Sequence, residues 1–259
     1  MEIRLSVIIL TKNEENNIVD CIESVNFADE IFIIDDFSED KTIDIVKNLR
    51  NPKIKILQHH LNNDFSSQRN LGLSQTKGEW VLFVDADERP SRALQGEINY
   101  LIWDDKRTQK INGYFIKRRD VMWGKELNYG ETGNIKLLRL AGRNSGIWEG
   151  KVHEVWKVKG RIGELKNLLY HYPHQTITEF LKEINFYTDI RAKELLDKNV
   201  KVYWSSIIIY PLGKFILNYV VKRGFLDGLH GLVFAILMSL HSFLVRGKLW
   251  ILWEKNRKS

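Results

Sequence analysis

Cysteine is nearly absent from this sequence, since its 259 residues include only Cys21. An internal disulfide is therefore excluded. No apolar segment of the kind that begins a secretory signal follows Met1. We therefore expect a protein of the reducing cytoplasm.

Long uncharged apolar runs are also lacking. The longest weakly charged stretch, residues 224–245, still contains Asp227, His230 and His241. Because charge at the centre of a spanning helix is costly, we expect this region to lie on a membrane surface as a peripheral segment. A spanning segment and a soluble C-terminal helical core are the alternatives. Residues 201–259 contain nine Lys or Arg and two acidic residues, which gives them a net charge of +7. Because the whole chain has a net charge of +6, residues 1–200 have a net charge of −1. Basic, aromatic and apolar residues together favour an anionic membrane over nucleic acid as the partner.

Glycine-rich phosphate loops are absent too, because the sequence has neither a Walker A loop nor a G-x-G-x-x-G turn. A phosphate-bearing ligand would then need a metal ion, rather than a glycine-rich helix start, to neutralise its charge. With 44% hydrophobic and 28% charged residues, the composition is that of an ordinary globular protein, which argues against wholesale disorder.

Short apolar runs alternate with segments of helical periodicity over the first hundred residues. This alternation predicts an α/β fold with a doubly wound, mostly parallel sheet, in which ligands gather at the carboxyl ends of the strands. We expect a first domain over 1–200 and an amphipathic helical region over 201–259. The predicted strands are 5–10, 31–34, 54–57, 80–84, 113–117 and 135–140, and the predicted helices are 15–25, a helix that opens at Ser38, 66–75 and 176–196.

Polar residues follow three of these strands at the points where they end. Each group alone is explained by a helix cap or a turn, but three groups at one sheet edge indicate a site. Alternation along an extended backbone would place Asp85 and Asp87 on the same side, so that both approach one divalent cation, which can bridge a diphosphate. The three groups are Thr11, Asn13 and Glu14; Asp35 and Asp36; and Asp85, Asp87 and Glu88.

Several ordered motifs resemble those of family 2 glycosyltransferases of the GT-A fold. They are the runs 6–14 (SVIILTKNE) and 34–42 (IDDFSEDKT), then Gln68-Arg69-Asn70 and Asp85-Ala86-Asp87. Residues 148–154 (WEGKVHE) and 223–228 (RGFLDG) are similar to the branch that includes lipopolysaccharide core glucosyltransferases.

The resemblance implies roles for the strand-end residues. Asp36 would hydrogen-bond the uracil ring, Arg69 would lie near the diphosphate, and Asp85 would meet the ribose or the metal. Asp87 would hold a Mg or Mn ion, which acts as a Lewis acid on the departing nucleoside diphosphate. The Q-x-x-R-W segment of processive members is absent, which favours transfer of a single sugar. The implied nucleotide-sugar site comprises Thr11, Asn13, Glu14, Asp35, Asp36, Arg69, Asn70 and Asp85.

Inverting members of the family also need a carboxylate that removes the acceptor's proton. It must lie opposite the leaving group, which excludes the acids that hold the metal. Glu154 and Glu149 are the candidates. We favour Glu154 because His153 beside it could contact the metal or a phosphate, but a surface loop without chemistry remains an alternative.

The sequence therefore predicts an inverting glycosyltransferase that moves a sugar from a nucleotide-sugar, a UDP-sugar, to a lipid-linked or lipopolysaccharide-core acceptor at the cytoplasmic face of the inner membrane. Two alternatives stay open. One is a non-catalytic nucleotide-sugar-binding membrane scaffold. The other is a nucleotidyltransferase, which usually begins with a Gly-rich basic loop where this chain has Thr11-Lys12-Asn13-Glu14-Glu15.

Overall fold

A computed structural model of the protein describes residues 3–62, 64–103, 111–150 and 154–258. The chain forms two compact units. The first comprises Met1–Arg118 and Lys136–His171, and the second Arg119–Ile135 and Tyr172–Ser259.

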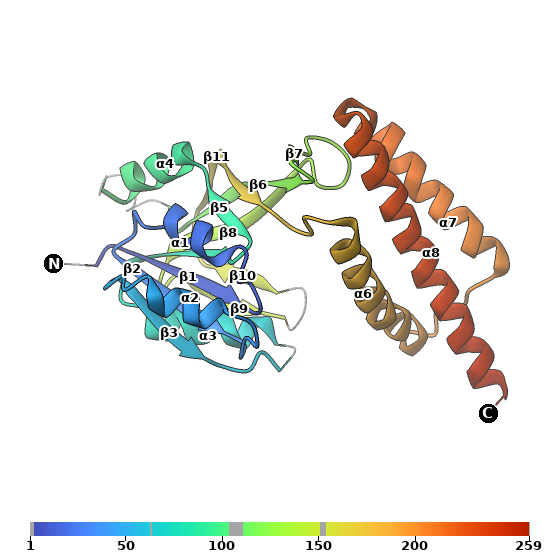
Figure 1. Ribbon diagram of the computed structural model, residues 1–259, viewed down its shortest axis with the longest axis horizontal. Helices are drawn as coiled ribbons and strands as arrows, with labels where there is room; N and C mark the ends of the chain where they lie inside the picture. Colours follow the sequence, from blue (N-terminus) through green and yellow to red (C-terminus); the bar gives the residue numbers. More distant parts are fainter. Residues whose placement is uncertain (1–2, 63, 104–110, 151–153, 259) are drawn as a thin grey trace. The chain divides into compact units, whose positions relative to one another are not determined.

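Four parallel strands form one half of the sheet in the first unit (Figure 1). Every residue of β1 and β2 is buried, as expected for continuous apolar runs in central strands that are covered on both faces. The predicted α/β class is therefore confirmed. The sheet order is β3-β2-β1-β4, with β1 at Leu5–Thr11, β2 at Glu30–Asp35, β3 at Ile54–Gln58 and β4 at Trp80–Asp85.

Alternate residues of β1 face two separate apolar layers. Val7 and Ile9 belong to a cluster with α1 (Ile18–Ser24), α2 (Thr42–Asn48) and α4 (Arg92–Trp103), whereas Ile8 and Leu10 pack with Leu73 of α3 (Phe65–Gln75). This is the double winding that the sequence predicts.

Helix α2 begins at Thr42 and not at Ser38, where the sequence predicts its start. The backbone N–H and the hydroxyl of Ser38 both donate to the Asp35 carboxylate. Asp40 accepts from the Thr42 N–H at 2.9 Å, so a turn held by side chains precedes the helix.

The other half of the sheet contains antiparallel pairs and continues in the order β8-β6-β11-β5. β8 pairs with β4, and β11 pairs with β5 so that His171 lies opposite Glu88. A separate hairpin pairs Trp148 of β9 with Trp156 of β10. The strands are β5 (Glu88–Pro90), β6 (Gly113–Met122), β7 (Lys125–Glu126, paired with β6), β8 (Ile135–Gly142), β9 (Gly146–Glu149), β10 (Val155–Val158) and β11 (Ile162–His171).

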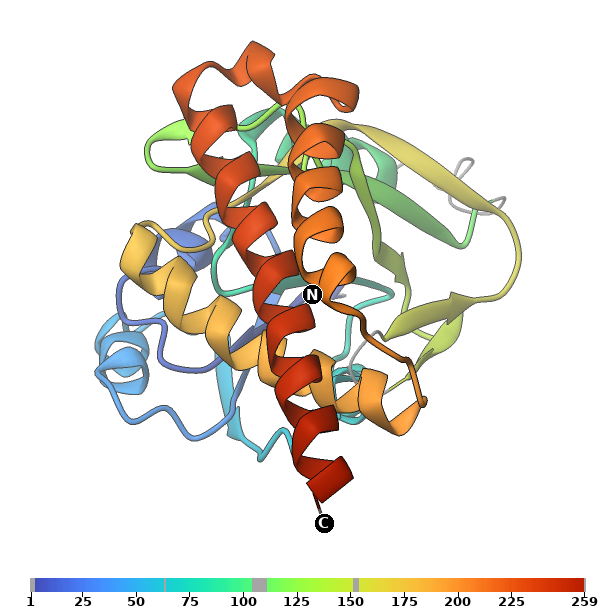
Figure 2. The ribbon, with the colours of Figure 1, turned by 90° about the vertical axis from the view of Figure 1, so that its right-hand side faces the viewer.

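The second unit consists mainly of helices, with α6 and α7 packed along α8 (Figure 2). Ala192 and Leu195 of α6 pack against Val245 and Leu249 of α8. The compact units therefore place residues 172–200 with the C-terminal helices, whereas the sequence predicts a boundary at residue 200. The elements are α6 (Ile177–Asp197), α7 (Trp204–Ile216), the π-helix η1 (Leu217–Val221), the 3-10 helix η2 (Gly224–Asp227) and α8 (Leu229–Lys258).

The RGFLDG segment has a structural role in the second unit. The buried carboxylate of Asp227 accepts from the N–H groups of Asn128 and Tyr129 at 3.0 and 2.9 Å. Lys125 Nζ donates to the Asp227 carbonyl at 2.8 Å. A Cβ at Gly231 would lie 1.9 Å from the Gly224 carbonyl oxygen, so this close approach requires glycine.

Candidate active site

The carboxyl ends of β1, β2 and β4 meet at one edge of the sheet, as the sequence predicts. Thr11 lies opposite Asp35, and Leu10 lies opposite Asp85 in the strand register. The Thr11 hydroxyl is buried and has no hydrogen-bond partner among the described residues. A buried hydroxyl of this kind can serve a ligand at the strand ends.

Asp36 lies just beyond β2 with a largely buried carboxylate. It accepts from Lys12 Nζ at 2.7 Å and from the Leu61 N–H at 3.0 Å. Although burial opposes the charge, these hydrogen bonds from Lys12 and Leu61 lower the pKa of Asp36 below its ordinary value. The adjacent Phe37 has a φ of 51° and stacks on His60 with ring centroids 3.9 Å apart. An ionised acceptor beside exposed aromatic rings is suited to a nucleobase edge.

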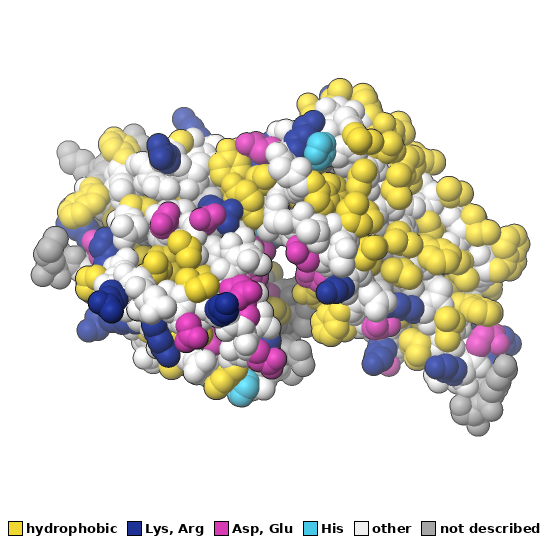
Figure 3. All heavy atoms as spheres, in the orientation of Figure 1, with side chains coloured by type: hydrophobic (Ala, Val, Ile, Leu, Met, Phe, Trp, Pro, Cys, Tyr) yellow, Lys and Arg dark blue, Asp and Glu magenta, His cyan; other side chains and the backbone are white. Residues whose placement is uncertain are grey.

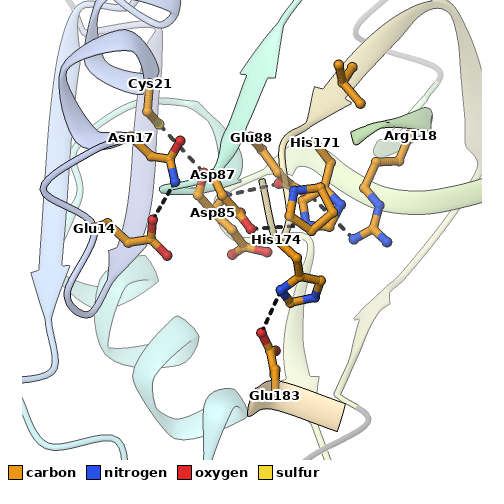
Figure 4. Close-up of polar contacts among 12 residues, drawn as sticks. Glu14, Asn17, Cys21, Asp85, Asp87, Glu88, Arg118, His171, His174 and Glu183 are labelled. Carbon is orange, nitrogen blue, oxygen red and sulfur yellow. Dashed lines mark hydrogen bonds and ion pairs between the residues drawn. The ribbon is translucent and has the colours of Figure 1, made fainter. Parts of the chain in front are cut away.

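Three other predicted nucleotide-site residues hold the surrounding loops. Asp35 is fully buried and accepts from Gln58 Nε2 at 3.0 Å as well as from Ser38. The Asn13 amide oxygen accepts from the Glu39 N–H at 2.8 Å. Glu14 accepts from Asn17 Nδ2, also at 2.8 Å (Figure 4). These contacts shape the loops that carry Thr11 and Asp36, and direct contact with a nucleotide remains a prediction.

Asp85 lies between two buried arginines. Its Oδ1 accepts from Arg69 Nη2 at 3.0 Å and its Oδ2 from Arg139 Nη2 at 2.5 Å. Burial raises the pKa of Asp85, but the two guanidinium groups outweigh it and hold that pKa well below its usual range. Burial lowers the pKa of Arg139, and the charges of Asp85 and Glu88 reverse this and raise it overall. Both shifts favour the charged forms of Asp85 and Arg139, which are therefore an ion pair.

Glu88 lies directly behind Asp85 and is fully buried. Its carboxylate accepts from the Asp85 N–H at 3.0 Å and from Arg139 Nη2 at 3.3 Å. Burial raises the pKa of Glu88 above its ordinary value, although Arg139 acts in the opposite direction. Arg139 thus compensates the buried Glu88 and the partly buried Asp85 at once.

Asp87 does not share the partners of Asp85. Residues 86 and 87 form a turn between β4 and β5, so the extended backbone expected across Asp85-Ala86-Asp87 is wrong. Asp87 Oδ2 instead lies 3.1 Å from His171 Nε2, which the β5–β11 register brings to it (Figure 4). These side chains retain 24% and 15% of their exposure, so a ligand can reach both.

The pair formed by Asp87 and His171 fits a divalent cation, because carboxylate oxygen suits Mg²⁺ and Mn²⁺ and neutral imidazole is a common metal ligand. The described residues contain no group of three or more His, Cys, Asp or Glu side chains arranged to hold a metal ion. The remaining ligands would then be diphosphate oxygens and water, as is usual for Mg²⁺ with nucleotides. His153, the third predicted metal residue, lies outside the described residues.

The two candidate bases occupy different surroundings. Glu154 Oε1 accepts from Arg69 Nε at 3.1 Å, and its side chain is 15% exposed. Glu149 ends β9 and is exposed. Asn70 exchanges two hydrogen bonds of 2.9 Å with the backbone of Trp148, which ties α3 to β9. The structure therefore brings Glu154, and not Glu149, into the arginine cluster.

A cavity of about 410 Å³ opens beside Glu154 in the first unit. Arg139 and the indole rings of Trp148 and Trp156 also line it. These two rings stack with centroids 5.4 Å apart. The cavity gives Glu154 and Arg139 a shared space that a substrate can enter.

Residues 6–148 match the family model described as glycosyl transferase family 2. The chain belongs to this family. An uncharacterized glycosyltransferase of Rickettsia typhi is 28% identical over 98% of this chain and 89% of its own length. The lipopolysaccharide core biosynthesis glycosyltransferase LpsC of Rhizobium meliloti is 27% identical over 95% of this chain and 92% of its own. Among solved structures, S. aureus TarS 1–349 in complex with UDP-GlcNAc has a TM-score of 0.48 and 17% identity, covering 98% of this chain and 92% of that one.

Two residues of this glycosyltransferase's cluster are missed by reasoning from the sequence. Arg139 interrupts the apolar strand segment Leu137–Ala141, and a charge in a run that is otherwise buried signals a buried partner. His171 ends β11, but its pairing with Asp87 depends on an antiparallel register that sequence periodicity does not reveal.

We predict that Arg139→Gln destabilises the glycosyltransferase by about 3 kcal/mol near neutral pH, because it removes the buried cation that Glu88 shares with the partly buried Asp85. The raised pKa of Glu88 favours its neutral form at low pH. The stability deficit should therefore grow as pH rises from about 4 to about 7.

Denaturant unfolding at several pH values would measure this change. Lys136→Gln is the matched control, because it removes one positive charge from the exposed end of the same strand. A deficit that is independent of pH, or equal in both variants, would contradict the proposed compensation.

Proposed function

We propose that this family 2 glycosyltransferase transfers a single sugar from a UDP-sugar to a lipid-linked or lipopolysaccharide-core acceptor, with inversion at the anomeric carbon. One observation carries the proposal: Arg69 hydrogen-bonds both Asp85, at the end of β4, and Glu154, beside the cavity of the first unit. The name of LpsC supports an acceptor in lipopolysaccharide core synthesis.

In this proposal the nucleoside lies over the ends of β1 and β2. Asp36 accepts a hydrogen bond from the base edge with a lone pair that Lys12 and Leu61 leave available, since a carboxylate has about four such positions. Arg69 Nη1 is buried and has no hydrogen-bond partner among the described residues, so it supplies a donor for a diphosphate oxygen.

Asp87 and His171 would hold Mg²⁺ or Mn²⁺ against the diphosphate. When bound, the cation supplies Lewis-acid stabilisation of the negative charge that develops on the leaving UDP. Asp85 remains between its two arginines. Its hydrogen bonds hold the side chains of Arg69 and Arg139 at the strand ends.

Glu154 is the proposed general base. It removes the proton from the acceptor hydroxyl as that oxygen forms its bond to the anomeric carbon, while the bond from the anomeric carbon to the diphosphate oxygen breaks on the opposite face. Arg69 Nε orients Glu154 by a hydrogen bond at 3.1 Å. The same guanidinium therefore positions the base and faces the leaving group.

The helical unit is proposed to bind the cytoplasmic leaflet of the inner membrane peripherally. Trp204–Val221 and Leu229–Arg257 are long and apolar enough to cross a membrane by length and composition alone. Apolar side chains make up much of the face of α7 and α8 that Figure 3 shows. Lys214, Arg246 and Lys248 interrupt these segments, which makes an interfacial position less costly than a central one.

Family membership removes the nucleotidyltransferase alternative. A non-catalytic scaffold would bind the nucleotide-sugar without turning it over. Assays of sugar transfer and of hydrolysis with several UDP-sugars distinguish this alternative from the proposal.

Asp36→Ala should weaken UDP binding about tenfold and slow saturated turnover much less, because a base-edge hydrogen bond is equally strong in ground and transition states. Calorimetry with UDP measures the affinity. Glu39→Ala is the control, because it removes an exposed acid of the same loop. Equal UDP affinity in Asp36→Ala and wild type would remove Asp36 from the nucleotide site.

Asp87→Ala should abolish transfer with little loss of stability, because this partly exposed turn residue contributes little to the core. EDTA should abolish wild-type activity, and the electron paramagnetic resonance signal of Mn²⁺ should report bound ion in wild type only. Full wild-type activity in EDTA, or turnover by Asp87→Ala at the wild-type rate, would rule out this metal site.

Glu154→Gln should keep donor affinity and lower turnover by about two or more orders of magnitude, the scale typical of a general base. Glu149→Gln is its matched control on β9 and should remain active. If Glu149→Gln is inactive and Glu154→Gln is active, the two roles must be exchanged.

The full-length protein should float with anionic liposomes and be released by high salt or carbonate, as expected for peripheral binding. A control with purely zwitterionic liposomes should recover little protein. Protein that resists carbonate would show a spanning segment, and protein that ignores both liposomes would exclude the membrane proposal.

A further inference from the structure

Three helices of the second unit line an open cavity of about 490 Å³, and none of its lining residues is assigned to sugar transfer. Each helix contributes one cation to its lining: Arg191 from α6, Lys214 from α7 and Arg246 from α8. No acidic side chain is among the described residues that line the cavity. Three separately placed positive charges therefore converge on one space.

The three cations differ in how they are compensated. Arg191 pairs with Glu194 at 2.7 Å and Lys214 with Glu131 at 2.5 Å. Arg246 has no carboxylate partner among the described residues, and its guanidinium lies over the ring of Tyr210 at 4.1 Å. Stacking on an aromatic face fixes the guanidinium plane and leaves its N–H groups directed outward. Arg246 is thus oriented as a donor to an anion.

Apart from His241 and Ser242, the rest of the described lining is mainly apolar or aromatic. Leu195, Leu217 and Val245 form walls of the cavity, and Ile209 both lines it and is 64% exposed on α7. Ile209 therefore extends the apolar part of the lining to the exposed surface of α7. A ligand that matches this lining has an anionic group attached to a hydrocarbon portion.

We propose that this cavity binds an anionic phospholipid, with its phosphate on Arg246, Arg191 and Lys214 and its glycerol and acyl chains along Ile209 and Leu217. A guanidinium recognises phosphate by paired charge-assisted hydrogen bonds, which a compact ammonium does not. The inference rests on the proposed membrane association, but adds a specific site to what would otherwise be diffuse electrostatic attraction.

Arg246→Gln tests the site in vesicle binding, with Arg257→Gln as the matched control on the same helix. Both variants lose one positive charge, and Arg257 is an exposed residue outside the cavity. Diffuse attraction would weaken binding to phosphatidylglycerol-containing vesicles about fivefold in either variant. If the site exists, vesicle affinity should fall about tenfold or more in Arg246→Gln only. A loss of this size corresponds to hydrogen bonds with a charged group. Equal losses in the two variants would overturn the proposal.

A short-chain phosphatidylglycerol, used as a monomer below its micelle concentration, separates the site from surface potential. Tryptophan fluorescence should report its binding to the wild type and to Arg257→Gln. Arg246→Gln should bind it at least about tenfold more weakly, and Arg246→Lys should fall between.

Glycerol 1-phosphate is the competitor that identifies the source of the phosphate. If it binds as tightly as the short-chain lipid, the site takes a soluble phosphate and the lipid proposal is wrong. Short-chain phosphatidylcholine should bind weakly, and equal binding of the two lipids would also overturn the proposal.

Circular dichroism verifies that each variant is folded. UDP affinity should be unchanged in all of them, so failure of the lipid site and failure of the glycosyltransferase assignment are read from different measurements.

Discussion

The Asp85 carboxylate ends a buried strand and is itself partly buried, so it needs positive charge close by. Two elements that lie far from Asp85 in the sequence supply this charge. Arg69 comes from α3 and Arg139 from β8. Breaking a buried ion pair costs about 3–5 kcal/mol, because the remaining charge is left uncompensated. Arg69 also holds Glu154, and Arg139 also holds Glu88. The position of each element therefore constrains the others, and a loop carboxylate is fixed against the sheet without regular secondary structure of its own.

Sequence patterns predict the parallel half of this sheet well, because local physics decides it. Runs such as Val7–Leu10 and Ile31–Ile34 are apolar on both faces, and only strands covered on both sides bury such runs. Convergence of Thr11, Asp35 and Asp85 then follows from parallel strand direction. The partners of these residues are not local. Arg139 is 54 positions from Asp85, and antiparallel pairing rather than periodicity brings His171 to Asp87.

Local patterns fail where side chains compete with the backbone. Ser38 and Asp35 form a hydrogen-bonded turn in place of the first turn of α2. A turn after Asp85 likewise separates the partners of Asp85 from those of Asp87, although alternation along an extended chain would join them. In both cases a short polar segment after a buried strand departs from regular geometry. Such segments are where ligands are held in α/β proteins, so these errors fall at the candidate site itself.

The charged residues of the C-terminal helices set conditions on the proposed contact between those helices and a membrane. Lys214 lies within the apolar segment Trp204–Val221, and Arg246 and Lys248 lie within Leu229–Arg257. In hydrocarbon each would need a partner, and among the described residues Lys214 and Lys248 have carboxylate partners whereas Arg246 has none. A phosphate in the cavity would supply the missing counter-charge at the depth where lipid headgroups occur. The charge of Arg246 makes a spanning position costly, and the same charge therefore favours a position among the lipid headgroups.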